Sequence, residues 1–222
     1  ICLDGSLDAA SVADLQKPDI RPRVVFACEW IEGAGFPSVR SDNKGGMDLA
    51  VEHLVGLGHR RIGFLAGPPG NILTQERFDG AQAALARHGL RIDPDLIDGH
   101  DFSLEAGQRA AARMVAAADR PTAVLCSSDQ LAIGLISGLA GFGLSVPGDM
   151  SVVGFDDIAY APFSLPPLTT VRQDRVKLGQ TAAEMMLDHL AADPLAPPQA
   201  PDRVAHIPVS LIERASTARR VG

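Results

Sequence analysis

Two adjacent carboxylates, Asp156 and Asp157, follow a short apolar run of the sequence, Val152–Phe155. The run begins with two β-branched residues and is typical of a buried strand. In open α/β sheets, ligands bind beyond the carboxyl ends of the strands, which is where such a pair would lie. A carboxylate at that place can accept hydrogen bonds from two neighbouring sugar hydroxyls at once. The pair therefore predicts a ligand-binding crevice at this edge of the sheet.

The segment after the two carboxylates predicts a crossing between two lobes. Pro162, Pro166 and Pro167 exclude a helix and favour extended backbone. The chain then enters a second short strand at Thr169–Val171. The chain thus passes a binding crevice, crosses in an extended segment and enters a further element. This order is typical of a hinge between two lobes.

Helical and strand periods alternate along most of the chain. Strands separated by helices indicate βαβ units and a mostly parallel sheet, so the fold class is α/β. We expect helices over about 43–57, 74–87, 129–142 and 175–190, with another beginning after Ser103. We expect the end of a strand at 1–3 and strands at 24–28, 62–66, 122–126, 152–155, 169–171 and 204–211.

The composition excludes several classes of function for this chain. The formal net charge is −7 and the basic residues are dispersed, whereas a surface that binds duplex DNA should be basic. Cys2, Cys28 and Cys126 lie scattered in apolar runs, which indicates reduced thiols and a cytoplasmic location. The sequence contains no metal-ligand spacing, no phosphate-binding loop and no nucleophile elbow. We therefore expect no metal, no cofactor, no membrane segment and no enzyme activity.

Five segments, in order and at the expected spacings, resemble the effector-binding domain of the lactose-repressor (LacI/GalR) family. The resemblance runs from Ile1 to about Thr217. The segments are DNKGGMDLAVEHLVGLGHRRIGFLAGP (42–68), ERFDGAQAAL (76–85), RPTAVLCSSDQLAIG (120–134), GLSVPGDMSVVGFDDIAYAPFSLPPLTTVRQD (143–174) and LGQTAAEMML (178–187).

This resemblance implies a two-lobed fold like that of type I periplasmic binding proteins, with parallel sheets flanked by helices and a sugar-like effector between the lobes. Residues 1–58 with about 173–195 would form an incomplete N-terminal lobe, and residues 59–172 with about 198–216 the C-terminal lobe. It also implies an N-terminal helix-turn-helix domain that binds operator DNA, which is absent from this sequence, and a homodimer. Helix faces around Ile133–Gly141 and the segment Tyr160–Leu165 are candidate dimer contacts.

The resemblance also assigns effector contacts, of which Asp156 and Arg77 are the foremost. The first aspartate of the GFDD motif, Asp156, contacts the effector in the family, and we expect Asp157 to cap a turn instead. Arg77 lies in the RxxG pattern, whose arginine reaches the effector with a fork of donors. A surface salt bridge with Glu76 or Asp79 is the alternative for Arg77.

Four further positions are candidate effector contacts. Phe102 could stack on the apolar face of a sugar or a base, or it could be a core residue. Ser128 stands where the family often carries asparagine. Asn71 follows a glycine-rich loop and could donate to a hydroxyl or be a plain loop residue. Gln173 lies on a crossover, where its amide could face the effector.

We favour a ligand-responsive transcriptional regulator, whose effector would be sugar-like or nucleoside-like. Its alternatives are a periplasmic sugar-binding protein of a transporter, which shares the fold, and an enzyme that uses the acidic pair. For an enzyme, no nucleophile–base pair accompanies Asp156 and Asp157.

Overall fold

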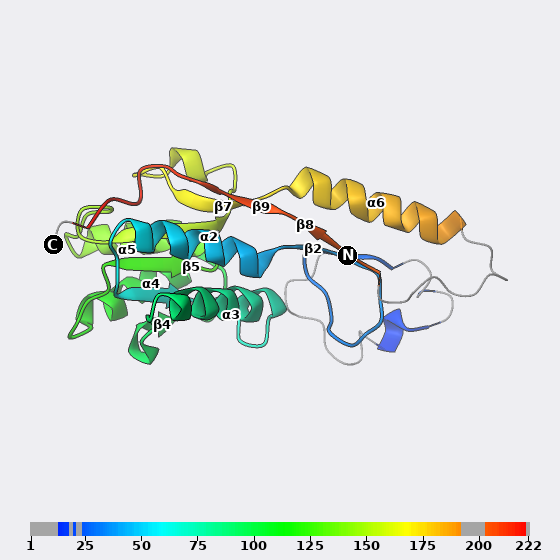
Figure 1. Cartoon of the computed structure of the whole chain (residues 1–222), viewed down its shortest axis with the longest axis horizontal. Coiled ribbons are helices and arrows are strands. Elements are labelled where there is room, and N and C mark those ends of the chain that lie inside the picture. The colour runs from blue at the N-terminus through cyan, green and yellow to red at the C-terminus, as the bar shows by residue number, and fades with distance from the viewer. Residues whose placement is uncertain (1–12, 18–19, 21–23, 192–202, 221–222) are drawn as a thin grey trace. The chain divides into compact units, whose positions relative to one another are not determined.

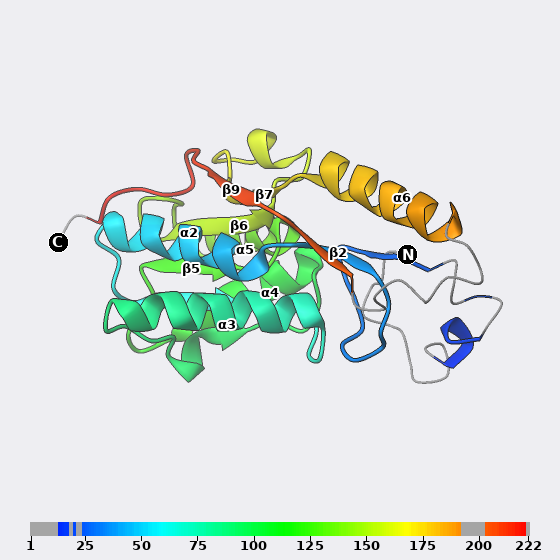
Figure 2. The same cartoon turned by 45° about the vertical axis from the view of Figure 1, so that its right-hand side comes forward.

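A computed structural model describes residues 13–17, 20, 24–191 and 203–220. The chain divides into two compact units: Ile1–Asp42 with Asp174–Pro208, and Asn43–Gln173 with Val209–Gly222. Figures 1 and 2 show the elements of both units. The expected strand at Ile1–Leu3 lies outside the described residues.

The smaller unit contains a three-stranded parallel sheet in the order β1-β2-β8, made by Phe26–Ala27, Ser38–Ser41 and Val204–Ile207. Helix α6, Arg175–Ala191, packs on this sheet. Val39, Leu178 and Met185 belong to the cluster that joins helix and sheet. Leu178 and Met185 are the buried residues of α6, whereas Val176, Leu187 and Leu190 are exposed, so the buried stripe is narrower than the apolar residues of this helix predict.

The larger unit contains a six-stranded sheet in the order β4-β3-β5-β6-β7-β9. Only the edge strand β9 is antiparallel, so the carboxyl ends of the other strands share one edge. The strands are β3 (Ile62–Leu65), β4 (Ile97–Asp98), β5 (Ala123–Cys126), β6 (Ser151–Asp156), β7 (Thr169–Gln173) and β9 (Val209–Ile212).

Helices cover both faces of this sheet, as the continuous apolar strands require. Helices α4 (Leu104–Ala116) and α5 (Asp129–Gly141) pack against the face that presents Val124 and Cys126. Helices α2 (Asn43–Gly56) and α3 (Ile72–Arg87) pack against the face that presents Leu125. The two helices of each pair contact one another, and Figure 2 shows α2 and α3 running side by side.

The two-unit division differs from the expected lobe boundaries at two places. Helix α2 belongs to the larger unit, because Met47, Val51 and Leu54 pack into the core under the six-stranded sheet, so the boundary falls at 42/43 and not at 58/59. The expected single strand at 204–211 is two strands, β8 and β9, which belong to different units. Pro208, which has no N–H to donate, separates them.

Candidate functional site

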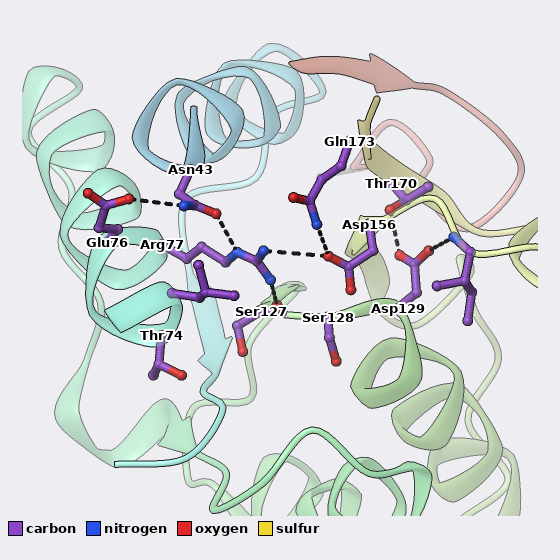
Figure 3. Close-up of polar contacts among 12 residues, drawn as sticks. Asn43, Thr74, Glu76, Arg77, Ser127, Ser128, Asp129, Asp156, Thr170 and Gln173 are labelled. Carbon is purple, nitrogen blue, oxygen red and sulfur yellow. Dashed lines mark hydrogen bonds and ion pairs between the residues drawn. The ribbon is translucent and has the colours of Figure 1, made fainter. Parts of the chain in front are cut away.

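A polar network lies at the carboxyl ends of the parallel strands of the larger unit (Figure 3). Asp156 is the last residue of β6 and Gln173 is the last residue of β7. Ser127 follows β5, and Arg77 reaches the same edge from α3. The structure therefore brings together three of the six predicted residues, namely Asp156, Arg77 and Gln173.

Arg77 is the largest fully buried side chain of the described residues, with 2% of it exposed. Its Nε donates to Asn43 Oδ1 at 2.9 Å, and one terminal nitrogen donates to the carbonyl oxygen of Ser127 at 2.5 Å. The guanidinium carbon lies 3.8 Å from the centre of the Phe155 ring. These contacts fix the plane of the guanidinium, since a cation held over a ring and by two acceptors has little freedom. A surface salt bridge of Arg77 with Glu76 or Asp79 is not what the structure shows.

The Arg77 guanidinium pairs with Asp156. Its Nη2 lies 3.5 Å from Asp156 Oδ1, close enough for an ion pair, yet this nitrogen makes no hydrogen bond within the described residues. Gln173 Nε2 donates to the same Asp156 oxygen at 2.5 Å. About a quarter of the Asp156 side chain, 24%, is exposed, in contrast to the buried arginine. Asp156 is thus the charged member of the pair that a ligand from solvent can reach.

The backbone turns sharply where Asp156 and Asp157 stand, with φ of 118° and 52°. Such angles cost side-chain-bearing residues on the order of 1–3 kcal/mol each, so other contacts must hold the turn. Asp157 is one of them: its carboxylate accepts from Arg172 Nε at 2.6 Å and from Arg214 at 2.7 Å. Burial opposes ionisation of Asp157, but the two arginines outweigh it and lower its pKa. The expected turn-capping aspartate is therefore an ion-pair residue that ties the end of β6 to β7 and to the chain that follows β9.

Two of the predicted contact residues cap helices. Asn71 Oδ1 accepts from the backbone N–H groups of Leu73 and Thr74 at the start of α3. Ser128 Oγ accepts from the backbone N–H of Leu131 at the start of α5. Both roles satisfy backbone donors that a helix start leaves unpaired. Ser128, and not the following residue Asp129, is therefore the N-cap of α5.

Phe102 is half-buried and packs against the core between the sheet and helices α4 and α5. A Cβ on Gly67 would lie 2.1 Å from the Phe102 ring, so the ring occupies the space that this glycine leaves. The structure places Phe102 beside the loop that follows β3, and not among the hydrogen bonds of Arg77 and Asp156.

The sequence analysis missed several residues of this network. Asn43 bridges two helices: its Oδ1 accepts from Arg77 and its Nδ2 donates to Glu76 Oε2 at 2.9 Å. The hydroxyls of Thr74 and Ser127 are buried and lack a hydrogen-bond partner within the described residues. Figure 3 shows both residues on the same side of Arg77. The sequence shows that Ser127 follows a strand and that Thr74 lies near the start of a helix. Neither position distinguishes these hydroxyls from those of ordinary polar side chains.

Asp129, the first residue of α5, is completely buried behind the turn. Its carboxylate accepts from Thr170 Oγ1 at 2.5 Å and from the backbone N–H of Ile158 at 2.8 Å. Burial raises the pKa of Asp129 to about 7, the two hydrogen bonds oppose this rise, and the charges of Asp156 and Asp157 add to it.

Metal and membrane sites find no support within the part of the chain that the structure describes. No group of three or more histidine, cysteine, aspartate or glutamate side chains is placed to hold a metal ion there. Among the same residues, no helix combines the length and the apolarity needed to cross a bilayer.

Comparison with known proteins identifies the family. Residues 51–217 match the family described as periplasmic binding protein-like domain. The chain is 38% identical over 178 residues to the HTH-type transcriptional repressor CytR of Escherichia coli strain K12, a match that covers 80% of this chain and 52% of that protein. The chain thus spans about half the length of the curated relatives it matches.

Solved structures give the same result. A LacI-family transcriptional regulator from Enterococcus faecium, solved with bound ribose, has a TM-score of 0.82 at 30% identity and covers 98% of this chain and 78% of that one. The lac repressor dimer bound to operator and the anti-inducer ONPF has a TM-score of 0.79 at 30% identity, covering 94% and 68%. The expected fold class is confirmed, and these relatives are regulators and not enzymes. The chain belongs to the periplasmic binding protein-like domain family, in the form carried by LacI-family transcriptional regulators.

Proposed function

We propose that this chain is the effector-binding and dimerisation part of a ligand-responsive transcriptional regulator. A small sugar-like or nucleoside-like molecule binds at the strand edge of the larger unit that carries Arg77 and Asp156. Its binding controls how tightly a helix-turn-helix domain, outside this sequence, holds operator DNA. The observation that carries the proposal is the buried guanidinium of Arg77 paired with a carboxylate that solvent reaches.

The chemistry of this edge fits a neutral molecule with several hydroxyl groups. The Asp156 carboxylate accepts hydrogen bonds from ligand hydroxyls, and Arg77 Nη2 donates one to a ligand oxygen. The Thr74 and Ser127 hydroxyls both donate and accept, and they have no other partner within the described residues. Buried polar atoms of this kind carry a free-energy cost until a partner arrives. A polyhydroxylated ligand, or water in its absence, supplies that partner.

For the other four predicted residues we propose indirect or peripheral roles in ligand binding. Gln173 holds the Asp156 carboxylate in place. Asn71 and Ser128 fix the starts of α3 and α5 through their caps. Phe102 offers a ring edge beside the loop at Gly67, against which the apolar face of a sugar or base can lie.

Regulation follows from differential affinity. An effector shifts the equilibrium between two conformations only by the ratio of its affinities for them. We propose that the regulator acts in the cytoplasm as a homodimer. An exposed apolar surface supports the dimer, since Tyr160, Phe163 and Leu165 are 74%, 80% and 88% exposed around the short helix η3 (Ala161–Phe163).

The alternative, a periplasmic sugar-binding protein of a transporter, shares the fold, and fold alone does not decide function. Relatives named as HTH-type transcriptional repressors and regulators support the regulator.

A thermal-shift screen of the whole chain against pentoses, hexoses and nucleosides tests the proposal. We expect at least one compound class to raise the melting temperature of the wild type and of Asp119→Asn, whose carboxylate is exposed on the surface. We expect the same compound to have no effect on Asp156→Asn. Stabilisation by none of the compounds, or equal stabilisation of Asp156→Asn, would contradict the proposed site.

A further inference from the structure

Asp129 lies directly behind the turn that presents Asp156, on the side away from solvent. A Cβ on Gly154 would come within 2.2 Å of Asp129 Oδ1, so the carboxylate rests against the backbone of β6 two residues before Asp156. Its other oxygen accepts the N–H of Ile158, two residues after Asp156. The carboxylate therefore touches the chain on both sides of the turn.

The turn needs such support. Asp156 and Asp157 have left-handed φ angles that side chains rarely adopt, and no glycine stands there to relieve the strain. The Ile158 N–H comes immediately after these two residues. A hydrogen bond from this N–H to a fixed, buried acceptor holds the chain at the far side of the turn. Thr170, on the neighbouring strand β7, in turn holds the acceptor through its hydroxyl.

We propose that Asp129 is a positioning residue of the effector site: it holds the Asp156–Asp157 turn in the conformation that presents the Asp156 carboxylate to the ligand. Asp129 does this from the core and does not touch the ligand. The inference rests on the proposed function for its consequence in binding, but its structural content can be tested without a ligand.

The hydrogen-bond pattern makes asparagine a conservative replacement. An amide oxygen at position 129 accepts the Ile158 N–H as the carboxylate does. The amide nitrogen then donates to Thr170 Oγ1. The Thr170 hydroxyl donates to Asp129 in the wild type and accepts in the variant. Alanine at the same position removes both bonds, so the half-buried N–H of Ile158 and the buried hydroxyl of Thr170 lose these acceptors. Asp129→Asn and Asp129→Ala therefore separate the hydrogen bonds from the negative charge.

Gly154→Ala provides an independent perturbation. Its φ is not in the left-handed region, so the backbone accepts alanine, but the new methyl group displaces the Asp129 carboxylate. We expect this variant to resemble Asp129→Ala at the turn, although Asp129 itself is still present.

Amide hydrogen exchange of the whole chain, resolved residue by residue by NMR, tests the inference. We expect the Ile158 amide to exchange roughly 10- to 100-fold faster in Asp129→Ala and Gly154→Ala, the factor that loss of a hydrogen bond to a carboxylate implies. In Asp129→Asn its protection should stay within about threefold of the wild type. Met114→Ala, a cavity variant in the same core, is the control for general destabilisation. It should change exchange evenly across the sheet without singling out Ile158.

Titration with D-ribose, or with whichever compound the thermal-shift screen selects, adds the functional readout. Asp129→Ala should bind at least tenfold more weakly, and Asp129→Asn should restore most of the affinity. Unchanged protection of Ile158 in Asp129→Ala, or loss of protection that Met114→Ala reproduces, would overturn the positioning role whether or not a ligand is found. Faster exchange of Ile158 in a chain that binds none of the compounds would uphold the positioning of the turn and contradict the proposed function alone.

Discussion

Replacing Asp129 by asparagine should change how the stability of the protein depends on pH. The pKa of this buried carboxyl is raised from 3.8 to about 7 in the folded chain. Well below pH 3.8 both the folded and the unfolded chain hold the proton, and burial of the carboxyl carries no ionisation penalty. As the pH rises towards 7, the unfolded chain releases the proton and the folded chain keeps it, so the free energy of unfolding falls. Above pH 7 the penalty is complete and constant.

The size of the effect follows from the two pKa values. Each pH unit between them is worth about 1.4 kcal/mol, which gives about 4 kcal/mol in total, of which about 2.5 kcal/mol falls between pH 5 and pH 8. The charges that face Asp129 are those of Asp156 and Asp157, and both remain in the variant. Cys126, whose pKa is raised by burial and by Asp129, stays protonated over this range.

Urea denaturation of the wild type and of Asp129→Asn at a series of pH values measures this difference. We expect the asparagine variant to gain stability relative to the wild type as the pH rises from 5 to 8, by about 2.5 kcal/mol, with an unchanged m value. The exposed control Asp119→Asn should run parallel to the wild type. Parallel curves for Asp129→Asn as well would refute the account, because they would mean that Asp129 ionises as an ordinary surface aspartate.

Three further predictions follow from the packing of the same unit. Arg77→Met should weaken binding of the selected compound about 10- to 100-fold, which is the worth of a hydrogen bond to a charged group. The near-ultraviolet circular dichroism of the variant should stay that of a folded chain. Undiminished affinity would contradict the site. Gly46→Ala should lower the free energy of unfolding in urea by about 1–3 kcal/mol, because its Cβ would lie 2.7 Å from the Phe155 ring. The control Gly56→Ala, with open space around it, should not lower it. Equal stability of the two variants would be evidence against this packing. Phe163→Asp should shift sedimentation from dimer towards monomer, and an unaltered sedimentation coefficient would exclude this exposed ring from the interface.

Much of the fold could be predicted because its signals are local. The apolar runs that became β3, β5 and β6 are too short for helices, and the glycines after α2 and α3 mark where those helices end. The unit to which α2 belongs could not be predicted from local sequence. An amphipathic helix shows which of its faces is buried, but not which sheet that face packs against. The split of the last strand at Pro208 was likewise hidden, since both halves have strand-like sequences.

Part of the candidate site could likewise be predicted from the sequence, and part could not. Asp156 and Arg77 were predicted from the motifs of the family, and the structure pairs them. The buried hydroxyls of Thr74 and Ser127 and the buried carboxyl of Asp129 were not predicted as parts of the site. Serine, threonine and aspartate at helix starts usually act as caps, and only three-dimensional packing shows which of them are buried beside Arg77 and Asp156 instead.

The most direct test of the central claim is a crystal structure of the chain with the compound that the thermal-shift screen selects. The account predicts ligand oxygens within hydrogen-bond distance, about 2.5–3.2 Å, of the Asp156 carboxylate and of Arg77 Nη2. A ligand bound at another place, with the Arg77–Asp156 pair left untouched, would contradict it.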